Sequence, residues 1–201
     1  MGRLVGASKP HEYVGPAAVP VSEDDDDGPE NPDRPSRLAI TGTPGTGKTS
    51  ATSNLDSAKV VHLNEVIREE ELWSQRDQQR GAVEADLDAV RAYLQEWSGI
   101  VESHLAHHLA ADRVIVLRCH PETLESRLRE RGASQAKISE NAQSEALDVI
   151  LSETVSEHGR ESVYEVDTTS LTPAEVAEEI TAVRQGDRTP SVGTVDFTDY
   201  L

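Results

Sequence analysis

An α/β fold with a parallel sheet of five strands is predicted by three features of the sequence. From Arg37 onward, short apolar segments alternate with amphipathic ones, as in proteins whose parallel strands are joined by helices. A glycine-rich stretch, ITGTPGTGKTS, overlaps and follows the first apolar segment. The last helical segment has a clear start at Thr172-Pro173 and a clear stop at Gly186. The 201 residues suffice for one such domain with tails.

Five segments are expected to be strands because each is a short, largely apolar run that polar or turn residues flank. The first leads directly into the glycine-rich stretch, and the third ends in acidic and hydroxyl residues. The five segments are residues 37–41, 59–63, 99–103, 113–119 and 162–168.

The helices are expected between and after these strands. One can follow the glycine-rich stretch, and another is expected at 83–97, where apolar residues recur at helical spacing. Pro121 suits the first turn of a helix that carries Leu124 and Leu128. Two more amphipathic helices are expected at 141–157 and from Pro173 to about Gln185. The helix at 83–97 would place on one face Val83, Leu87, Val90, Leu94 and Trp97.

Segments outside residues 37–185 are expected to be tails. Residues 1–36 are rich in proline and glycine, contain the run SEDDDD and lack apolar periodicity, so this acidic N-terminal extension is expected to be disordered. An acidic docking arm is the alternative interpretation. In the C-terminal tail, residues 186–201, several apolar side chains could pack back on the core: Val195, Phe197, Tyr200 and Leu201.

The charge balance is strongly acidic. The chain has 37 acidic and 19 basic residues, a formal net charge of −18, and only four of the basic residues are lysines. Partial disorder is one interpretation. The other is adaptation to a salt-rich prokaryotic cytoplasm, where the Debye length falls to roughly 3 Å at molar salt and like charges no longer repel at a distance. The spread of acid through the helical segments favours a halophilic archaeon or a similar source.

Composition also argues against several classes of protein. The acidic surface argues against broad binding of nucleic acids, which depends on Lys and Arg. The single cysteine, Cys119, cannot form an internal disulfide, which fits a reducing cytosol. No apolar run approaches 18 residues and no secretory signal is visible, so a cytoplasmic protein without a membrane span is expected.

The glycine-rich stretch predicts a phosphate site. Residues 42–49, GTPGTGKT, match the complete P-loop pattern GxxxxGK[ST]. Gly42, Gly45 and Gly47 let backbone N–H groups, including that of Thr46, approach phosphate oxygens, and the following helix N-terminus adds positive charge. In this pattern the lysine, Lys48, reaches the β- and γ-phosphates of ATP. The hydroxyl of Thr49 is expected to bind Mg²⁺.

A carboxylate from a neighbouring strand is expected to complete the Mg²⁺ site. The strand GIVES ends in Glu102, which is the natural candidate. A GTPase is not expected, because no NKxD motif occurs and the only DxxG match, Asp25 to Gly28, lies in the acidic tail.

Two groups of arginines are candidates for phosphate contacts. Arg127 and Arg131 are one helical turn apart, with Arg129 between them, and a short polar segment at about 130–140 follows. They form either a small lid over a polyphosphate or a solvated helix end. Arg68, a lone cation among glutamates, either binds a second phosphate or forms a surface ion pair.

Taken together, these motifs resemble one family. The stretches TGTPGTGKT, LNEVIREEEL, GIVESHL and VIVLRCHPETLESRLRERG, with SEN and ALDVILSE, are similar to archaeal adenylate kinases related to the nuclear adenylate kinase isoenzyme six. The resemblance covers about residues 37–184. It implies a P-loop domain with an NMP-binding region at about 62–86 and a very short lid at about 130–140.

The resemblance also implies roles for individual residues. Arg131 would contact ATP and Arg68 would hold AMP. Glu102-Ser103-His104 would match the metal-strand motif, although eukaryotic members have Asp where this chain has Glu102. The ATP-phosphate loop would comprise Gly45, Gly47, Lys48, Thr49 and Ser50.

The reaction that the resemblance implies is ATP + AMP ⇌ 2 ADP with Mg²⁺. Lys48, Arg131 and the metal would stabilise the transferring group, and no general base is required because the AMP phosphate is already anionic. His104 either helps to position water in an ATPase side activity or is a hydrogen-bonded histidine at a strand end. His107 and His108 follow it, but no third ligand pattern accompanies them, so no zinc site is predicted.

Two other functions stay open. One is an ATP-driven assembly factor that binds a small-subunit ribosomal protein during 16S rRNA maturation, as the resemblance implies. The other is a P-loop kinase of a small hydroxylated metabolite, in which Glu65 could act as the base.

Overall fold

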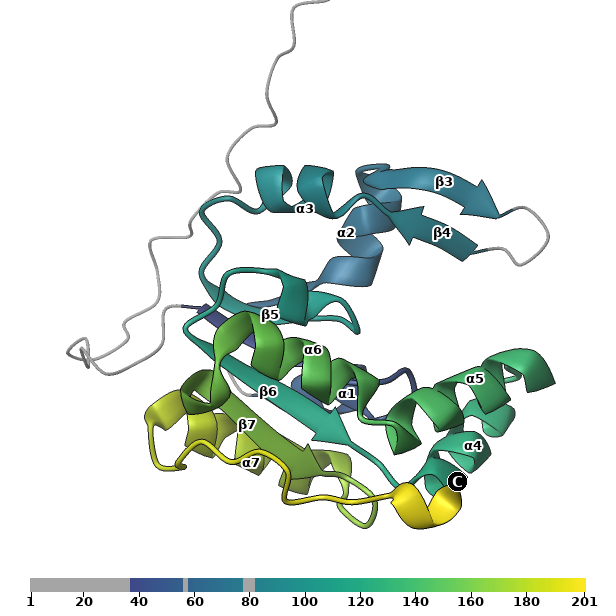
Figure 1. Cartoon of the computed structure of the whole chain (residues 1–201). Coiled ribbons are helices and arrows are strands. Elements are labelled where there is room, and N and C mark those ends of the chain that lie inside the picture. Colours follow the sequence, from purple (N-terminus) through teal and green to yellow (C-terminus); the bar gives the residue numbers. More distant parts are fainter. Residues whose placement is uncertain (1–36, 56–57, 78–81) are drawn as a thin grey trace, which may run out of the picture. The chain divides into compact units, whose positions relative to one another are not determined.

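The structure is a computed structural model, which describes residues 37–55, 58–77 and 82–201 (Figure 1). The predicted N-terminal extension, residues 1–36, lies outside the described residues. Among the described helices, none is long and apolar enough to cross a membrane.

The core of the fold is a parallel sheet of five strands in the order β2-β5-β1-β6-β7. All five predicted strands are confirmed, with ends that differ from the prediction by no more than one residue. The strands are β1 (Arg37–Thr41), β2 (Val60–His62), β5 (Gly99–Glu102), β6 (Arg113–Arg118) and β7 (Val163–Asp167).

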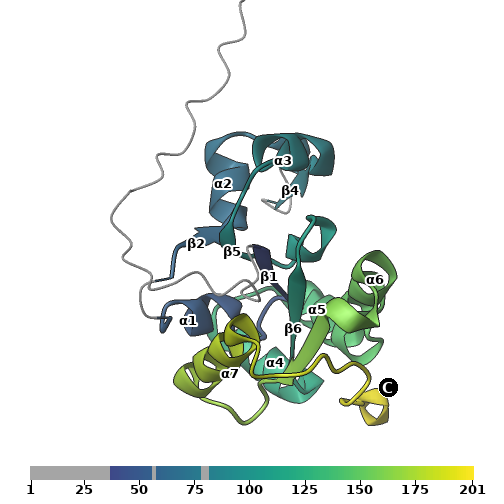
Figure 2. The same ribbon diagram turned by 90° about the vertical axis from the view of Figure 1, so that its left-hand side faces the viewer.

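Two layers of helices cover the sheet, because successive side chains of each strand point to opposite faces. In β1, Leu38 and Ile40 pack with α1 (Lys48–Thr52) and α7 (Pro173–Gln185), whereas Ala39 faces the other side. That second face is covered by η1 (Ala106–His108) and α6 (Val149–His158), as Figure 2 shows. The central strands are therefore buried on both faces, as parallel sheets require.

The helix predicted at 83–97 is correct in its middle but wrong at both ends, since residues 94–97 lie in a turn after it and residues 83–85 lie in a strand before it. Residues Ala82–Ala85 form strand β4, which pairs in antiparallel fashion with β3 (Trp73–Asp77). The helix, α3, spans only Leu87–Tyr93, because the side chain of Asp86 accepts hydrogen bonds from the N–H groups of Asp88 and Ala89 and so fixes its start. Val90 and Trp97 are nevertheless buried in one cluster with α2 (Leu63–Glu69).

The single helix predicted at 141–157 is in fact two. Helix α5 (Gln135–Ala146) ends at a turn in which Asp148 adopts a left-handed conformation, φ 53°, and α6 begins at Val149. The Asp148 side chain bonds to the buried guanidinium of Arg118, which holds the turn. The predicted lid at 130–140 is mostly helical, since α4 (Pro121–Glu130) and α5 leave only residues 131–134 between them.

The C-terminal tail packs back on the sheet, as the sequence predicts, but not through every expected side chain. Phe197 is buried, whereas Leu201 is exposed. Ser191 forms a parallel bridge with Tyr164 of β7. Two short 3₁₀ turns, η2 (Arg160–Ser162) and η3 (Thr198–Tyr200), complete this region.

The start of α7 gives a test of local stability. Thr172 and Glu175 form a capping box, in which each side chain accepts from the other residue's N–H. A Thr172→Ala substitution should lower the free energy of unfolding by about 1 kcal/mol, because it removes the N-cap acceptor. Urea unfolding measures this change. Thr189→Ala, at an exposed residue outside any helix, is the control and should change stability little; an equal loss in both variants would contradict the capping argument.

Candidate functional site

The glycine-rich loop joins β1 to α1 and needs its glycines for two reasons. Gly42, Gly45 and Gly47 have φ values of 135°, 104° and 99°, which side-chain-bearing residues rarely adopt. At Gly42 a Cβ atom would also lie 2.3 Å from the carbonyl oxygen of Leu117 in the adjacent strand β6. The loop therefore follows the carboxyl end of the sheet closely.

Lys48, the first residue of α1, folds back over this loop. Its Nζ donates to the carbonyl oxygens of Gly42 at 2.6 Å and Thr43 at 3.1 Å, and its side chain is buried. Burial lowers the pKa of Lys48 to about 8; the carboxylates of Glu102 and Glu145 partly offset this effect, and the guanidinium of Arg131 adds to it. A desolvated ammonium group thus lies at the centre of the loop, where a phosphate would be a favourable partner.

Glu102 and Thr49, the two predicted metal ligands, lie together. The Thr49 hydroxyl donates to Glu102 Oε1 at 3.1 Å, although the two residues are far apart in the sequence. The Nδ1 atom of His62 lies 2.9 Å from the same oxygen. A hydroxyl and a buried carboxylate at a P-loop are hard oxygen donors of the kind that Mg²⁺ prefers, so these residues fit that ion.

His104 follows Glu102 in the turn after β5. Burial, then the charge of Lys48, lower the pKa of His104 to about 4 against a partial opposing effect of Glu102. The imidazole is consequently neutral near pH 7. Next to it, Ser103 donates a hydrogen bond to Asn64 of α2 at 2.9 Å, which ties this turn to the helix that follows β2.

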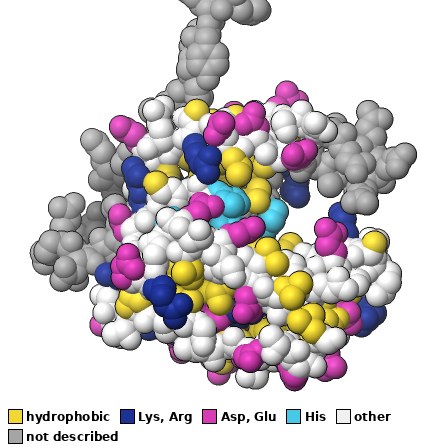
Figure 3. Space-filling model, viewed as in Figure 1, with side chains coloured by type: hydrophobic (Ala, Val, Ile, Leu, Met, Phe, Trp, Pro, Cys, Tyr) yellow, Lys and Arg dark blue, Asp and Glu magenta, His cyan; other side chains and the backbone are white. Residues whose placement is uncertain are grey.

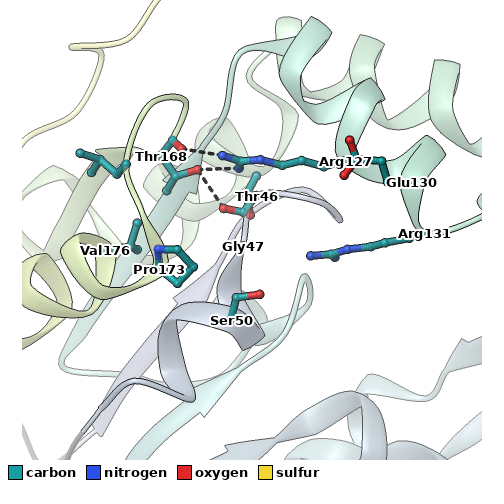
Figure 4. A pocket seen from close by; sticks show the side chains of 10 residues that line it. Thr46, Gly47, Ser50, Arg127, Glu130, Arg131, Thr168, Pro173 and Val176 are labelled. Carbon is teal, nitrogen blue, oxygen red and sulfur yellow. Dashed lines mark hydrogen bonds between the residues drawn. The ribbon is translucent and has the colours of Figure 1, made fainter.

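Two cavities meet at the loop. The first, of about 280 Å³, is drawn in Figure 4, and the second has about 180 Å³. Gly47 and Arg131 line both, so the cavities adjoin at the loop. The first is also lined by Thr46, Ser50, Arg127, Glu130, Thr168, Leu171, Pro173 and Val176. The second is also lined by Pro44, Gly45, Lys48, Thr49, Asn64, Glu102, His104 and Leu128.

The arginines that the sequence grouped together take different positions. Arg127 donates to the carbonyl oxygen of Thr168 at 2.9 Å, and Figure 4 shows it directed at that residue. Arg131 instead extends beside Gly47 (Figure 4). Arg129 is exposed, and its Nη2 atom lies 3.6 Å from Oε2 of Glu125. Of these three arginines, Arg131 alone lines both cavities, so the lid interpretation suits Arg131, and Arg127 supports the wall of the first cavity.

Arg68 is not brought to the cavities. It lies in the last turn of α2 and is exposed, and the described linings of the two cavities do not include it. Its predicted role therefore requires a different arrangement of α2, and it stays a prediction.

A buried ion-pair network next to the loop was missed from the sequence. Glu145, in α5, accepts hydrogen bonds from Arg118 Nε at 2.8 Å, from the N–H of Cys119 at 3.0 Å and from the hydroxyl of Thr43 in the loop. Arg118 also donates to Glu165 at 2.7 Å. Burial alone would lower the pKa of Arg118, but the carboxylates around it outweigh that effect and raise the pKa. The one sequence signal was a charged residue at the end of the apolar run VIVLR.

The comparisons with known proteins define the class of protein. The sequence matches the family described as AAA domain over residues 38–148, more than half of the chain. The chain therefore belongs to this P-loop family, in agreement with the loop geometry.

Archaeal relatives narrow the family. A protein of Natronomonas pharaonis is 60% identical over 154 residues, which cover 76% of this chain and 92% of the relative. A protein of Halobacterium salinarum is 55% identical over 155 residues, which cover 76% of this chain and 92% of the relative. A protein of Methanothermobacter thermautotrophicus is 45% identical over 146 residues, which cover 71% of this chain and 85% of the relative. Each relative carries the name "Putative adenylate kinase". The chain belongs to the same family as these archaeal proteins, which confirms that part of the resemblance. The relation to the nuclear adenylate kinase isoenzyme six stays a prediction.

A solved structure supports the fold assignment. The crystal structure of shikimate kinase from Bacteroides thetaiotaomicron matches with a TM-score of 0.51 at 16% sequence identity, over 76% of this chain and 99% of that one. At this identity the match shows a shared fold.

The buried, neutral His104 predicts acid sensitivity. In the unfolded chain its pKa is near 6.5, so between about pH 6.5 and pH 4 the unfolded state binds more protons and stability falls as the pH falls. His104→Gln should reduce the loss of unfolding free energy between pH 7 and pH 5 by about 1–2 kcal/mol. Urea unfolding at both pH values measures it. The control Gln143→Ala, at an exposed non-titrating residue, should keep the wild-type loss; an unchanged loss in His104→Gln would contradict the prediction.

Proposed function

We propose that this protein is a nucleotide kinase that transfers the γ-phosphoryl group of ATP to AMP and forms two ADP. The observation that carries the proposal is the junction of two cavities at one P-loop, with Gly47 and Arg131 common to both. A phosphoryl group held at that junction has room for a nucleoside on one side and for an acceptor on the other. The names of the archaeal relatives support the same reaction.

The first cavity suits the nucleoside of ATP. Its described walls combine apolar side chains from the start of α7 and the segment before it, Leu171, Pro173 and Val176, with polar groups of the loop. Apolar walls with a few polar groups are typical of sites for planar bases. From there the triphosphate would run along the loop past Thr46, Gly47 and Ser50, and the loop N–H groups would bind its oxygens.

The second cavity suits the acceptor phosphate. Lys48, Thr49, Glu102, His104 and Arg131 all line it, and Asn64 brings α2 to its edge. A phosphate of AMP is already an anion and needs no base to attack, so charge neutralisation and alignment are the main requirements. Lys48, which lines this cavity, and Arg131, which lines both, would supply them as the charge on the transferring group develops.

Mg²⁺ is expected to share this work. When bound, the ion would neutralise phosphate charge and orient the oxygens, and Thr49 and Glu102 would hold it. In this chain Glu102 is one carbon longer than the Asp of eukaryotic members, and its carboxylate reaches the Thr49 hydroxyl directly.

The metabolite-kinase and assembly-factor alternatives differ in how far the residues around the cavities suit them. Glu65, the base that the metabolite kinase would need, is an exposed residue of α2, and the described linings of the two cavities do not include it. His104 is neutral and lines the acceptor cavity, which suits a group that positions water for ATP hydrolysis. A role in ribosome maturation stays a prediction from the resemblance.

Two arginines two residues apart test the proposed junction. Arg131→Ala should lower kcat for ADP formation by about 100-fold or more, because a charge that faces the transferring group is lost. Arg129→Ala, in the exposed pair with Glu125, should stay within about twofold of wild type. Initial rates with saturating ATP, AMP and Mg²⁺ measure kcat. Equal values in the two variants would show that Arg131 has no role in phosphoryl transfer.

Arg68 tests whether AMP is the acceptor. Arg68→Ala should raise KM for AMP at least about tenfold, since the contact with the AMP phosphate that the resemblance implies would be lost, while ATP hydrolysis in the absence of AMP is retained. ADP production is followed with AMP, with other monophosphates and with water alone. If AMP did not raise the wild-type rate of ADP formation above that with water alone, the kinase proposal would be refuted. An unchanged KM in the variant would remove only Arg68.

A further inference from the structure

A second group of histidine and glutamate side chains lies between η1 and α6. His107 and His108 belong to η1, and Glu153 and Glu157 are one turn apart on α6, so the two glutamates share a helix face. Figure 3 shows histidine side chains gathered on this face of the protein with acidic side chains next to them. None of the four residues appears in the described linings of the two cavities, so the proposed kinase reaction does not account for them.

The four side chains form matched pairs at short distances. His107 Nε2 lies 3.3 Å from Glu153 Oε2, and His108 Nδ1 lies 2.6 Å from Glu157 Oε1. One ligand atom each of His107, His108 and Glu153 fall within 4.8 Å of one another. The two imidazole rings lie side by side, with centroids 4.0 Å apart. Three potential donor atoms therefore lie close together, and small side-chain movements would suffice to place them around one ion.

The histidine rings are held in orientations that suit ligands. The Nδ1 atom of His107 lies 2.9 Å from the Thr41 hydroxyl, which leaves Nε2 directed at Glu153. His107 is buried between these two partners, so its ring is held in one orientation. Metal-binding histidines commonly have such a partner on the other ring nitrogen.

We propose that His107, His108 and Glu153 form a binding site for a divalent transition-metal ion of the zinc class, with Glu157 orienting His108. Two imidazole nitrogens and one carboxylate are typical of Zn²⁺, and they also accept Co²⁺ and Ni²⁺, whereas Mg²⁺ and Ca²⁺ prefer oxygen ligands alone. Three protein ligands leave one position of a tetrahedral ion for water. This site is separate from the expected Mg²⁺ ligands Thr49 and Glu102.

The position of the proposed site means that a bound ion would link separate segments of the chain. η1 continues from the turn that carries His104, and α6 continues from the turn after α5. Through Thr41, His107 also contacts the last residue of β1, directly before the glycine-rich loop. A bound ion would join these three segments and stabilise the folded state, because the unfolded chain separates the ligands.

The simplest experiment is a zinc titration of the full chain without nucleotide, in high-salt buffer after removal of metals with a chelator. Calorimetry should show one equivalent of Zn²⁺, and Co²⁺ should give the absorption bands of a tetrahedral site. His108→Ala and Glu153→Gln should each weaken Zn²⁺ binding at least about tenfold. Both residues are less buried than His107, which makes folded variants easier to obtain. Zn²⁺ should also raise Tm of the wild type, but not of the variant that combines His108→Ala with Glu153→Gln.

The control removes a different imidazole. His62 lies 2.9 Å from Glu102 at the loop, so a His62→Ala variant loses one His–Glu pair outside the proposed site and should bind Zn²⁺ as the wild type does. Absence of Zn²⁺ binding by the wild type would overturn the proposal. Loss of binding in His62→Ala, with His108→Ala unaffected, would also overturn it, because the ion would then lie at the loop.

Discussion

The contacts of one buried carboxylate, that of Glu145, organise the region around the glycine-rich loop. It accepts hydrogen bonds from the loop hydroxyl of Thr43, the guanidinium of Arg118 and the N–H of Cys119. A buried charge is tolerated only when its partners are complete, and removal of one partner typically costs about 3–5 kcal/mol. Helix α5 is therefore held to the loop and to the end of β6 at the same time. Arg118 extends the network to Asp148, Glu165 and the backbone of α5.

This network explains how the side chain of Arg131 is held where the two cavities meet. The segment that carries Arg131 lies between α4 and α5, and both of its ends are fixed. α4 is anchored through Arg127 to the backbone of Thr168, and α5 through Glu145 to the loop. The Thr168 hydroxyl in turn donates to the carbonyl oxygens of Thr46 and Arg118, both at 2.8 Å. A short linker between two anchored helices can present one guanidinium to the loop with little loss of conformational entropy.

The sequence was sufficient for the features that depend on neighbouring residues. The five strands, the loop, the helix after Pro121 and the cap at Thr172 all follow from local patterns. Lys48 and Thr49 lie, as the motif predicts, at the start of the helix after the loop, and their roles stay predictions. Errors arose where distant residues decide the outcome. Ala82–Ala85 became a strand because β3 pairs with it, and the helix predicted at 141–157 broke because Asp148 bonds to Arg118.

The residues of the candidate site also fall into those that local sequence patterns indicated and those that depend on contacts between distant segments. Glu102 was found from its strand, but the helical spacing of Arg127 and Arg131 could not show that one faces Thr168 and the other the cavities. Glu145 had no recognisable signal, because its partners come from three other segments. The histidine pair at 107–108 was set aside for lack of a third ligand, and the candidate ligand comes from a helix that is remote in the sequence.

The two edge strands of the sheet, β7 and β2, limit pairing with another chain in different ways. An open edge strand exposes unpaired N–H and C=O groups, to which another chain can add. On one side, the tail covers β7: Ser191 bridges Tyr164, and Thr194 donates to the carboxylate of Glu165 at 2.7 and 2.9 Å. On the other side, β2 has only three residues. At the β7 edge, the main-chain groups of Val163 and Glu165 that bond to Ser191 are therefore satisfied within the chain and cannot pair with an added strand.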